Sequence, residues 1–239
     1  MLWHKIFIRF YTLLHTSLNH PFFGIIVAKF YREPRNRSPC RPIVNRNLKM
    51  VEATDSDKKR VVEILSRSFD DNKSVNYLIP QDSKRMQRIG ALMAYSYEQC
   101  RLWGKVVLSE DRKACALVIF PDRKRTTLPS LLLMGWLILK SIGFLNIAKA
   151  LDREGQVSNH HPATPFYHVW FLGVLPEYQG EGTGSKLLNE LLADANAMDR
   201  PVYLETSTHR NIPWYEKHGF SIYSKISLSY DLFLLRRNI

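Results

Sequence analysis

The run from Phe166 to Ser185, FYHVWFLGVLPEYQGEGTGS, constrains the fold more than any other stretch of the chain. Its first half, Phe166–Val174, is apolar on both sides of an extended chain, which is typical of a strand covered from above and below. Pro176 ends this strand because proline has no N–H to donate to a sheet. We therefore predict a central strand that leads into a glycine-rich loop.

The loop itself, QGEGTG at residues 179–184, is followed at once by a helical apolar pattern from Lys186 to Leu192. Glycines let backbone amides turn toward one point, and the helix start adds unpaired N–H groups and the positive end of its dipole. An anion such as a phosphate is the natural ligand of this arrangement. The spacing excludes a P-loop, which needs Gly-Lys-Ser/Thr, and a dinucleotide-binding Gly-x-Gly-x-x-Gly fingerprint, because Ser185 stands where the last glycine should be.

The loop resembles motif A of the GNAT acetyltransferases, [Q/R]-x-x-G-x-[G/A], with Gln179, Gly182 and Gly184 at the fixed positions. A second segment, NIPWYEKHGF at residues 211–220, is similar to the family's Tyr-x-Lys-x-Gly-Phe pattern, and the longer run YLETSTHRNIPWYEKHGF is similar to puromycin N-acetyltransferases. The resemblance covers roughly residues 50–239. It implies an α/β (α+β) chain with the GNAT fold, a mixed and mainly antiparallel sheet with helices on both faces.

The resemblance also implies a co-substrate, acetyl-coenzyme A, with its pyrophosphate on the glycine-rich loop and its acyl carbonyl near backbone amides of the opening central strand. The positions expected to bind it are Leu172, Gly173, Val174, Gln179, Gly180, Glu181, Gly182, Thr183, Gly184, Ser185 and Asn211. One departure affects the detail of this contact. The commonest family pattern has an asparagine seven residues before the tyrosine, and this chain has Thr208 there.

Acetyl transfer needs a proton donor and a base. The resemblance assigns the donor to Tyr215, whose phenol would protonate the departing thiolate. The base must deprotonate an alkylammonium, whose pKa is ordinarily about 10.4. Two candidates stay open: Glu205, whose pKa an apolar cleft would raise, and His168, whose imidazole suits proton uptake near neutrality. We favour Glu205, acting through a water.

The resemblance therefore implies an N-acetyltransferase that moves an acetyl group to a primary amine of a small molecule by direct attack in a ternary complex. Two alternatives remain. The chain could be a coenzyme A-binding sensor or scaffold with little catalytic activity, or an acyltransferase that works at a membrane surface.

The formal net charge of +12 is distributed unevenly along the chain. Residues 1–49 hold nine Lys/Arg and one acidic residue, whereas the rest holds 25 basic and 21 acidic residues. We expect residues 1–49 to be a basic leader, either an amphipathic arm for an anionic surface or a segment that is not translated because synthesis starts at Met50, and we favour the second. The domain at 50–239 has no basic stripe with interleaved aromatics, so we expect no nucleic-acid partner.

Residues 128–151 are predicted to be a helical insertion, because LPSLLLMGWLIL at 128–139 is almost wholly apolar and a second apolar helix follows. Twelve apolar residues are too few to cross a bilayer. Three interpretations compete: core helices, a lid over the acceptor pocket, or a membrane-surface contact. We favour core helices and place membrane contact last.

The other predicted elements are two amphipathic helices near 61–69 and 83–103, a hairpin at 105–120, a polar loop at 155–165, a strand at 201–205, a helix at 211–219 and strands at 220–224 and 226–233. The second helix should bury a stripe of Met86, Ile89, Met93, Tyr97 and Cys100.

The cysteines and the paired histidines are not expected to form a site. Cys40, Cys100 and Cys115 have no metal-ligand spacing, which indicates a reduced, cytoplasmic interior with Cys100 and Cys115 as buried thiols. His160 and His161 have no acidic or cysteine partner at ligand spacing, and adjacent side chains in a loop diverge. We therefore predict no metal ion.

Overall fold

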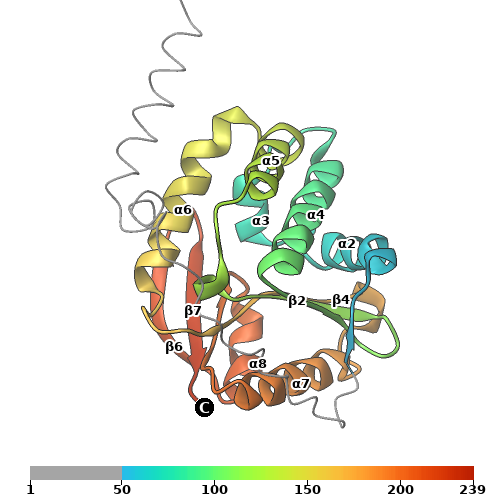
Figure 1. Ribbon diagram of the computed structural model, residues 1–239, viewed down its shortest axis with the longest axis vertical. Helices are drawn as coiled ribbons and strands as arrows, with labels where there is room; N and C mark the ends of the chain where they lie inside the picture. The colour runs from blue at the N-terminus through green and yellow to red at the C-terminus, as the bar shows by residue number, and fades with distance from the viewer. Residues whose placement is uncertain (1–49) are drawn as a thin grey trace, which may run out of the picture. The chain divides into compact units, whose positions relative to one another are not determined.

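One mixed sheet runs through the part of the chain that the computed structural model describes, residues 50–239 (Figure 1). Its seven strands there lie in the order β1-β2-β3-β4-β5-β7-β6, and only β4 and β5 are parallel neighbours. The strands are β1 (Val51–Glu52), β2 (Gly104–Leu108), β3 (Ala114–Ile119), β4 (Tyr167–Val174), β5 (Val202–Thr206), β6 (Ser221–Ser227) and β7 (Asp231–Arg237). The predicted mainly antiparallel sheet is confirmed, and β4 is its middle strand.

Helices cover both faces of the sheet, as predicted. The helices are α2 (Lys58–Ser68), α3 (Lys73–Leu78), α4 (Arg85–Trp103), α5 (Leu128–Leu137), α6 (Ile147–His160), α7 (Thr183–Ala197) and α8 (Ile212–Lys217). In Figure 1, α2 and α4 lie on one side of the sheet and α7 and α8 on the other. A π-helical turn (Ile138–Ile142) and a 3-10 turn (Phe144–Asn146) connect α5 to α6.

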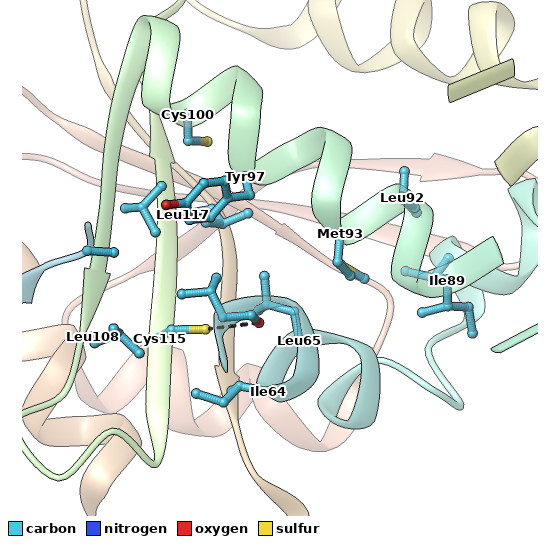
Figure 2. Close-up of a cluster of buried hydrophobic side chains, with 14 of the residues drawn as sticks. Ile64, Leu65, Ile89, Leu92, Met93, Tyr97, Cys100, Leu108, Cys115 and Leu117 are labelled. Atoms are coloured by element: carbon cyan, nitrogen blue, oxygen red, sulfur yellow. Dashed lines mark hydrogen bonds between the residues drawn. The ribbon is translucent and has the colours of Figure 1, made fainter. Parts of the chain in front are cut away.

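The core between α2, α4 and the sheet is built from residues that alternate along the strands. On β2, Val106 and Leu108 face α2 and α4, whereas Val107 faces α7, as the two-residue period of a strand requires. Figure 2 shows the helix side of this cluster, where Cys115 Sγ lies 3.9 Å from the Val61 carbonyl oxygen. The thiols of Cys100 and Cys115 are fully buried, as predicted.

The predicted stripe of α4 is confirmed except at its first residue. Ile89, Met93, Tyr97 and Cys100 are at most 1% exposed, but Met86 is 44% exposed. Met86 is the second residue of α4 and lies beyond the edge of the covered surface. The spacing of apolar residues predicts which side of a helix is buried, but it does not predict how far along the helix the neighbouring elements cover that side.

Some predicted boundaries were wrong. The segment predicted as a polar loop at 155–165 is largely the end of α6, which runs to His160. Residues 70–82 contain a short helix, α3, begun by the side chain of Asn72, which accepts from the N–H of Val75. The turn between the last two strands lies at 228–230, where Leu228 N–H donates to the Tyr230 carbonyl. The predictions for residues 1–49, including Cys40, lie outside the described residues.

The insertion is helical, as predicted, but α5 is not a core helix. None of its residues is buried. A helix that is apolar all round usually lies in a core, and this rule carried the prediction. Here α5 packs on α4 along one side only, so most of its apolar surface stays exposed.

Candidate active site

The parallel strands β4 and β5 are neighbours over a short stretch only. They pair at Tyr167 with Val202 and at His168 with Tyr203, and then they separate. On its other side, β4 stays paired with β3 as far as Val174. The predicted opening of the central strand is therefore present, and it begins directly after His168.

The backbone of β4 presents polar groups to this opening. Leu175 N–H donates to the Lys113 carbonyl at 3.0 Å, which fixes the alternation of the antiparallel β3–β4 ladder. By that alternation, the N–H groups of Leu172 and Val174 point away from β3, toward the opening, and that of Gly173 points to β3. Leu172 and Val174 thus fit the predicted role of backbone donors.

The packing of α2 on β4 requires a glycine at position 173. A Cβ built there would lie 3.0 Å from Leu65 Cδ2 and 3.0 Å from Ser68 Oγ. The close approach is made by α2, which packs on β4, and it leaves no room for a larger residue. Ser68 also donates to the Val174 carbonyl at 2.7 Å, so α2 holds the end of β4 in place.

The glycine-rich loop has the geometry of an anion-binding turn. Gly180 and Gly182 have φ angles of 87° and 85°, a left-handed conformation that side-chain-bearing residues avoid. A Cβ at either position would meet nothing within 4 Å, so conformation and open space, not packing, call for glycine there. Gly182 is the N-cap of α7, whose first N–H groups have no intrahelical acceptor.

The rest of the loop ties this turn to the opening. Gln179 Nε2 donates to the Val174 carbonyl at 3.1 Å, and Ser185 Oγ accepts from the Trp214 indole N–H at 2.8 Å. A Cβ at Gly184 would lie 3.2 Å from Val174 Cγ2. Glu181 is exposed, and Thr183 is half-buried in the first turn of α7. The chain's residues therefore fit a pyrophosphate on the loop and an extended arm along β4.

A buried cluster of three side chains lies where β4 and β5 separate. His161, after the end of α6, places Nε2 2.8 Å from Glu205 Oε1, and His168 on β4 places Nε2 2.8 Å from Glu205 Oε2. The side chains of His161, His168 and Glu205 are 13%, 10% and 8% exposed. The two candidate bases of the sequence are thus direct hydrogen-bond partners.

The prediction of a raised pKa at Glu205 was wrong. Burial alone would raise it, but the charge of His168 and hydrogen bonds from both imidazoles hold the pKa of this carboxyl well below its ordinary value. Glu205 is therefore a carboxylate at neutral pH and accepts from both Nε2–H groups. Nδ1 of each imidazole has no hydrogen-bond partner among residues 50–239.

A buried cation lies near this carboxylate. Arg153 on α6 donates from Nε to Ser74 Oγ at 3.0 Å and to Tyr230 Oη at 3.3 Å, and its side chain is 13% exposed. Burial lowers the pKa of this guanidinium, but the charges of Glu154, Tyr230 and Glu205 raise it above its usual value overall. Arg153 thus compensates part of the buried negative charge.

The same three side chains are the group within residues 50–239 that could hold a metal ion, since their ligand atoms lie within 4.8 Å of one another. Each Nε2 is already directed at a carboxylate oxygen of Glu205, so the cluster is satisfied as a hydrogen-bonded set. The nearby guanidinium of Arg153 also disfavours a divalent cation. The sequence argument about His161 was wrong on one point, because Glu205 is its acidic partner across 44 positions.

Tyr215 lies in the second half of α8 and packs with Trp214 and Phe220. Burial, with a contribution from the charge of Glu205, raises its pKa above the ordinary value, so the phenol stays protonated through the neutral range. Asn211 precedes α8 and is partly buried. Thr208 caps the preceding 3-10 turn, and its N–H donates to Thr206 Oγ1 at 3.2 Å.

Sequence reasoning missed His161 and Arg153. Both lie just after the predicted insertion at 128–151, Arg153 on α6 and His161 directly behind it, and both come near Glu205 only through the packing of α6. One sequence feature could have indicated His161. It lies six residues before the start of the central strand, so the chain must bring it close to the site.

Comparison with known proteins agrees with the fold and the loop. Residues 136–222 match the model of the acetyltransferase (GNAT) domain. An S-alkylcysteine N-acetyltransferase of Bacillus subtilis (strain 168) is 29% identical in an alignment of 94 residues. The alignment covers 32% of this chain and 52% of that protein. The chain thus spans about half the length of this curated relative.

Two solved structures share the fold. A histone acetyltransferase HPA2 and related acetyltransferase from Corynebacterium glutamicum superposes with a TM-score of 0.60 at 22% identity, over 80% of this chain and 95% of the other. Arylalkylamine N-acetyltransferase 2 from Aedes aegypti superposes with a TM-score of 0.55 at 15% identity, over 81% and 99%. The similarity to puromycin N-acetyltransferases stays a prediction.

The matched domain model includes β4, the glycine-rich loop, α7, β5 and α8, the elements that form the opening and its surroundings. A GNAT domain implies an acyl-coenzyme A co-substrate. The seven-stranded sheet over residues 50–239, the loop and the domain match lead to one conclusion: residues 136–222 of this chain match the GNAT acetyltransferase domain, and they lie within a GNAT fold.

Proposed function

We propose that this chain is an N-acetyltransferase that uses acetyl-coenzyme A to acetylate a primary amine of a small molecule. The observation that carries the proposal is the coincidence of three features: β4 and β5 separate after His168, the anion-binding turn lies at the far end of β4, and the Glu205 cluster lies where the separation begins. The curated relative supports the amine class, since its name gives an amino acid derivative as its substrate.

Acetyl-coenzyme A would supply an activated acetyl thioester. The turn at 179–184 and the start of α7 would hold its phosphates, and the N–H groups of Leu172 and Val174 would stabilise negative charge on the acyl oxygen. The phenol of Tyr215 is protonated and would donate to the leaving sulfur.

His168 is the base in this proposal, and Glu205 positions it. Both oxygens of Glu205 already accept hydrogen bonds, and a carboxyl with a lowered pKa is a weak base. In its neutral form, with Nε2–H donating to Glu205, the imidazole keeps a lone pair on Nδ1 that can accept the proton of an ammonium. The positive charge that it then carries is the charge that lowers the pKa of Glu205. His168 lies on β4 at the start of the opening, so it is the better placed of the two imidazoles.

The test is thiol release from acetyl-coenzyme A across a panel of primary amines, for the unchanged chain and for His168→Gln. We expect the variant to lose about 100- to 10,000-fold in kcat/KM and to lose the limb of the pH profile that reports the base. His160→Gln is the matched control, because His160 is the exposed neighbour of His161 and bonds only the Gln156 carbonyl.

Two results would overturn the assignment. If the unchanged chain releases no thiol with any amine yet binds coenzyme A, the scaffold alternative is correct. If His168→Gln keeps the pH profile and Glu205→Gln loses it, the carboxylate is the base after all.

A further inference from the structure

The insertion exposes an apolar surface much larger than isolated surface hydrophobics would explain. Of the fourteen large exposed hydrophobic side chains within residues 50–239, nine lie between 128 and 151. We call these nine the apolar surface: Leu128, Leu131, Leu132, Met134, Trp136, Leu139, Phe144, Leu145 and Leu151. Contiguous exposed apolar patches of this kind mark a contact with a partner or a membrane.

The apolar surface is carried by a bent pair of helices. Leu128–Ile142 and Phe144–His160 meet at 104°, with Gly143 at φ 70° in the bend. At the bend, Phe144 and Leu145 are 68% and 95% exposed. In Figure 1, α5 and the start of α6 form the end of the domain opposite α7 and α8.

The bend is held rigidly from behind. Asn146 Nδ2 donates to the Leu78 carbonyl at 2.9 Å, and Arg88 Nη1 donates to the Ser141 carbonyl at 3.2 Å. Ser141 and Ile142 are buried against the domain. The exposed side chains are therefore presented by a fixed scaffold.

The charged side chains within residues 123–151 have one sign. Residues 123–151 contain five basic residues, Arg123, Lys124, Arg125, Lys140 and Lys149, and no acidic residue. A shallow hollow beside Leu139 is lined by Lys84, Gln87, Arg88 and Lys140. Neither Lys84 nor Lys140 has an ion-pair partner within the described part of the chain.

Apolar side chains bordered by unpaired cations match an anionic lipid surface better than a protein partner. Protein interfaces are depleted in lysine, whereas helices that lie in the membrane interface combine leucine, phenylalanine and tryptophan with a basic border. The single helices within residues 50–239 are too short or too polar to cross a bilayer, and only the bent pair together has the length and composition. This favours a segment that lies in the interface.

We propose that the apolar surface docks this chain on an anionic phospholipid bilayer. Phe144 and Leu145 enter the acyl boundary, and Lys84, Lys140 and Lys149 contact lipid phosphates. Sequence reasoning favoured core helices over a lid and a membrane contact, and the exposure of α5 removes the first of these three interpretations.

The test is co-sedimentation of the full chain with vesicles of phosphatidylcholine alone and with about 30% phosphatidylserine. The chain should bind the anionic vesicles more tightly and lose that preference at high salt. The double change Lys140→Gln and Lys149→Gln should weaken binding to anionic vesicles roughly 25-fold, at about fivefold per cation. The changes Lys59→Gln and Lys73→Gln, at exposed lysines on α2 and α3, are the matched control.

The apolar contribution has its own variant. Phe144→Gln with Leu145→Gln should weaken binding at least about tenfold on either vesicle without altering net charge. Leu102→Gln, at an exposed leucine on α4, should have no effect. Circular dichroism of each variant confirms that it is folded.

Two outcomes would overturn the proposal. One is absence of vesicle binding together with a dimer in sedimentation velocity that the Phe144 and Leu145 changes dissociate, which would identify a second copy of the chain as the occupant. The other is absence of both binding and dimer, which would mean that neither a bilayer nor a second copy covers the apolar surface.

Discussion

Changing Glu205 to glutamine tests the buried cluster independently of catalysis. The carboxylate accepts from Nε2 of His161 and of His168, each at 2.8 Å. Glutamine keeps the shape but has one acceptor oxygen, so one imidazole N–H must face an NH₂ group. Because a buried hydrogen bond to a charged group contributes about 1.5–3 kcal/mol, we expect Glu205→Gln to lower the free energy of unfolding by about 2–4 kcal/mol at neutral pH.

The pH dependence of this difference follows from the direction of the Glu205 shift. The pKa of the carboxyl is lower in the folded chain than its ordinary value, so as the pH falls the unfolded state binds a proton first. Its stabilisation is complete above the unfolded pKa and is lost as the pH falls toward the folded value. Between about pH 5 and pH 3.5 this loss is on the order of 1 kcal/mol. The glutamine variant has no such group, so the difference between the two chains should shrink by that amount.

The assay is urea unfolding followed by tryptophan fluorescence, for both chains, at several pH values in this range. Titrating groups distant from Glu205 are common to both chains and cancel in the difference, whereas His161 and His168 contact Glu205 and are therefore compared in a second pair of chains in which both are glutamine. A difference that stays constant, or grows as the pH falls to 3.5, would refute the assignment of a lowered pKa to Glu205. His160→Gln should leave the free energy of unfolding within about 0.5 kcal/mol of the unchanged chain.

Three further predictions rest on single contacts. Gly173→Ala should lower the free energy of unfolding by about 1–3 kcal/mol in urea unfolding, because its Cβ meets Leu65 and Ser68 at 3.0 Å; an unchanged midpoint would contradict this packing. A Cβ added by Gly182→Ala meets no atom within 4 Å, so this change should lower the free energy of unfolding by only about 1–2 kcal/mol, through backbone strain. It should also weaken coenzyme A binding measured by calorimetry. An unchanged affinity would show that the loop does not bind the co-substrate. Burial raises the pKa of the Cys115 thiol, so a thiol reagent followed by peptide mass spectrometry should label Cys115 only after unfolding; rapid labelling of the folded chain would contradict its burial.

The features that the sequence predicted correctly depend on local spacing. Phe166–Val174 became the middle strand because residues on both of its sides are apolar, and the glycines after it adopt the conformation that glycine permits. The hairpin at β2 and β3 follows from alternation across a short polar turn. In each case the secondary structure follows from residues within one segment, so it could be predicted without knowing which distant segments that segment contacts.

The site was harder to predict because its chemistry depends on contacts between segments. Glu205 and His168 were both named as candidates, but their hydrogen bond joins positions 37 apart and cannot be read from either segment. That contact reverses the expected pKa shift of Glu205, since burial raises the pKa of a lone carboxyl and paired imidazoles lower it. It also changes the proposed roles, from a carboxylate base to an imidazole base that a carboxylate positions.

The prediction that the insertion forms core helices was wrong for a different physical reason, and that reason bears on the function of the insertion. Hydropathy measures what a side chain prefers, not what the rest of the chain has available to cover it. On this side of the sheet, α2 and α4 already cover the strands, so α5 packs on α4 and not on the sheet. A sequence that nevertheless keeps Phe144 and Leu145 at the exposed bend, within a stretch (123–151) that has five cations and no acidic residue, tolerates a cost to solubility. Positions that break a local rule in this way tend to be functional, and the one environment that satisfies both the apolar side chains and the cations is the surface of an anionic bilayer.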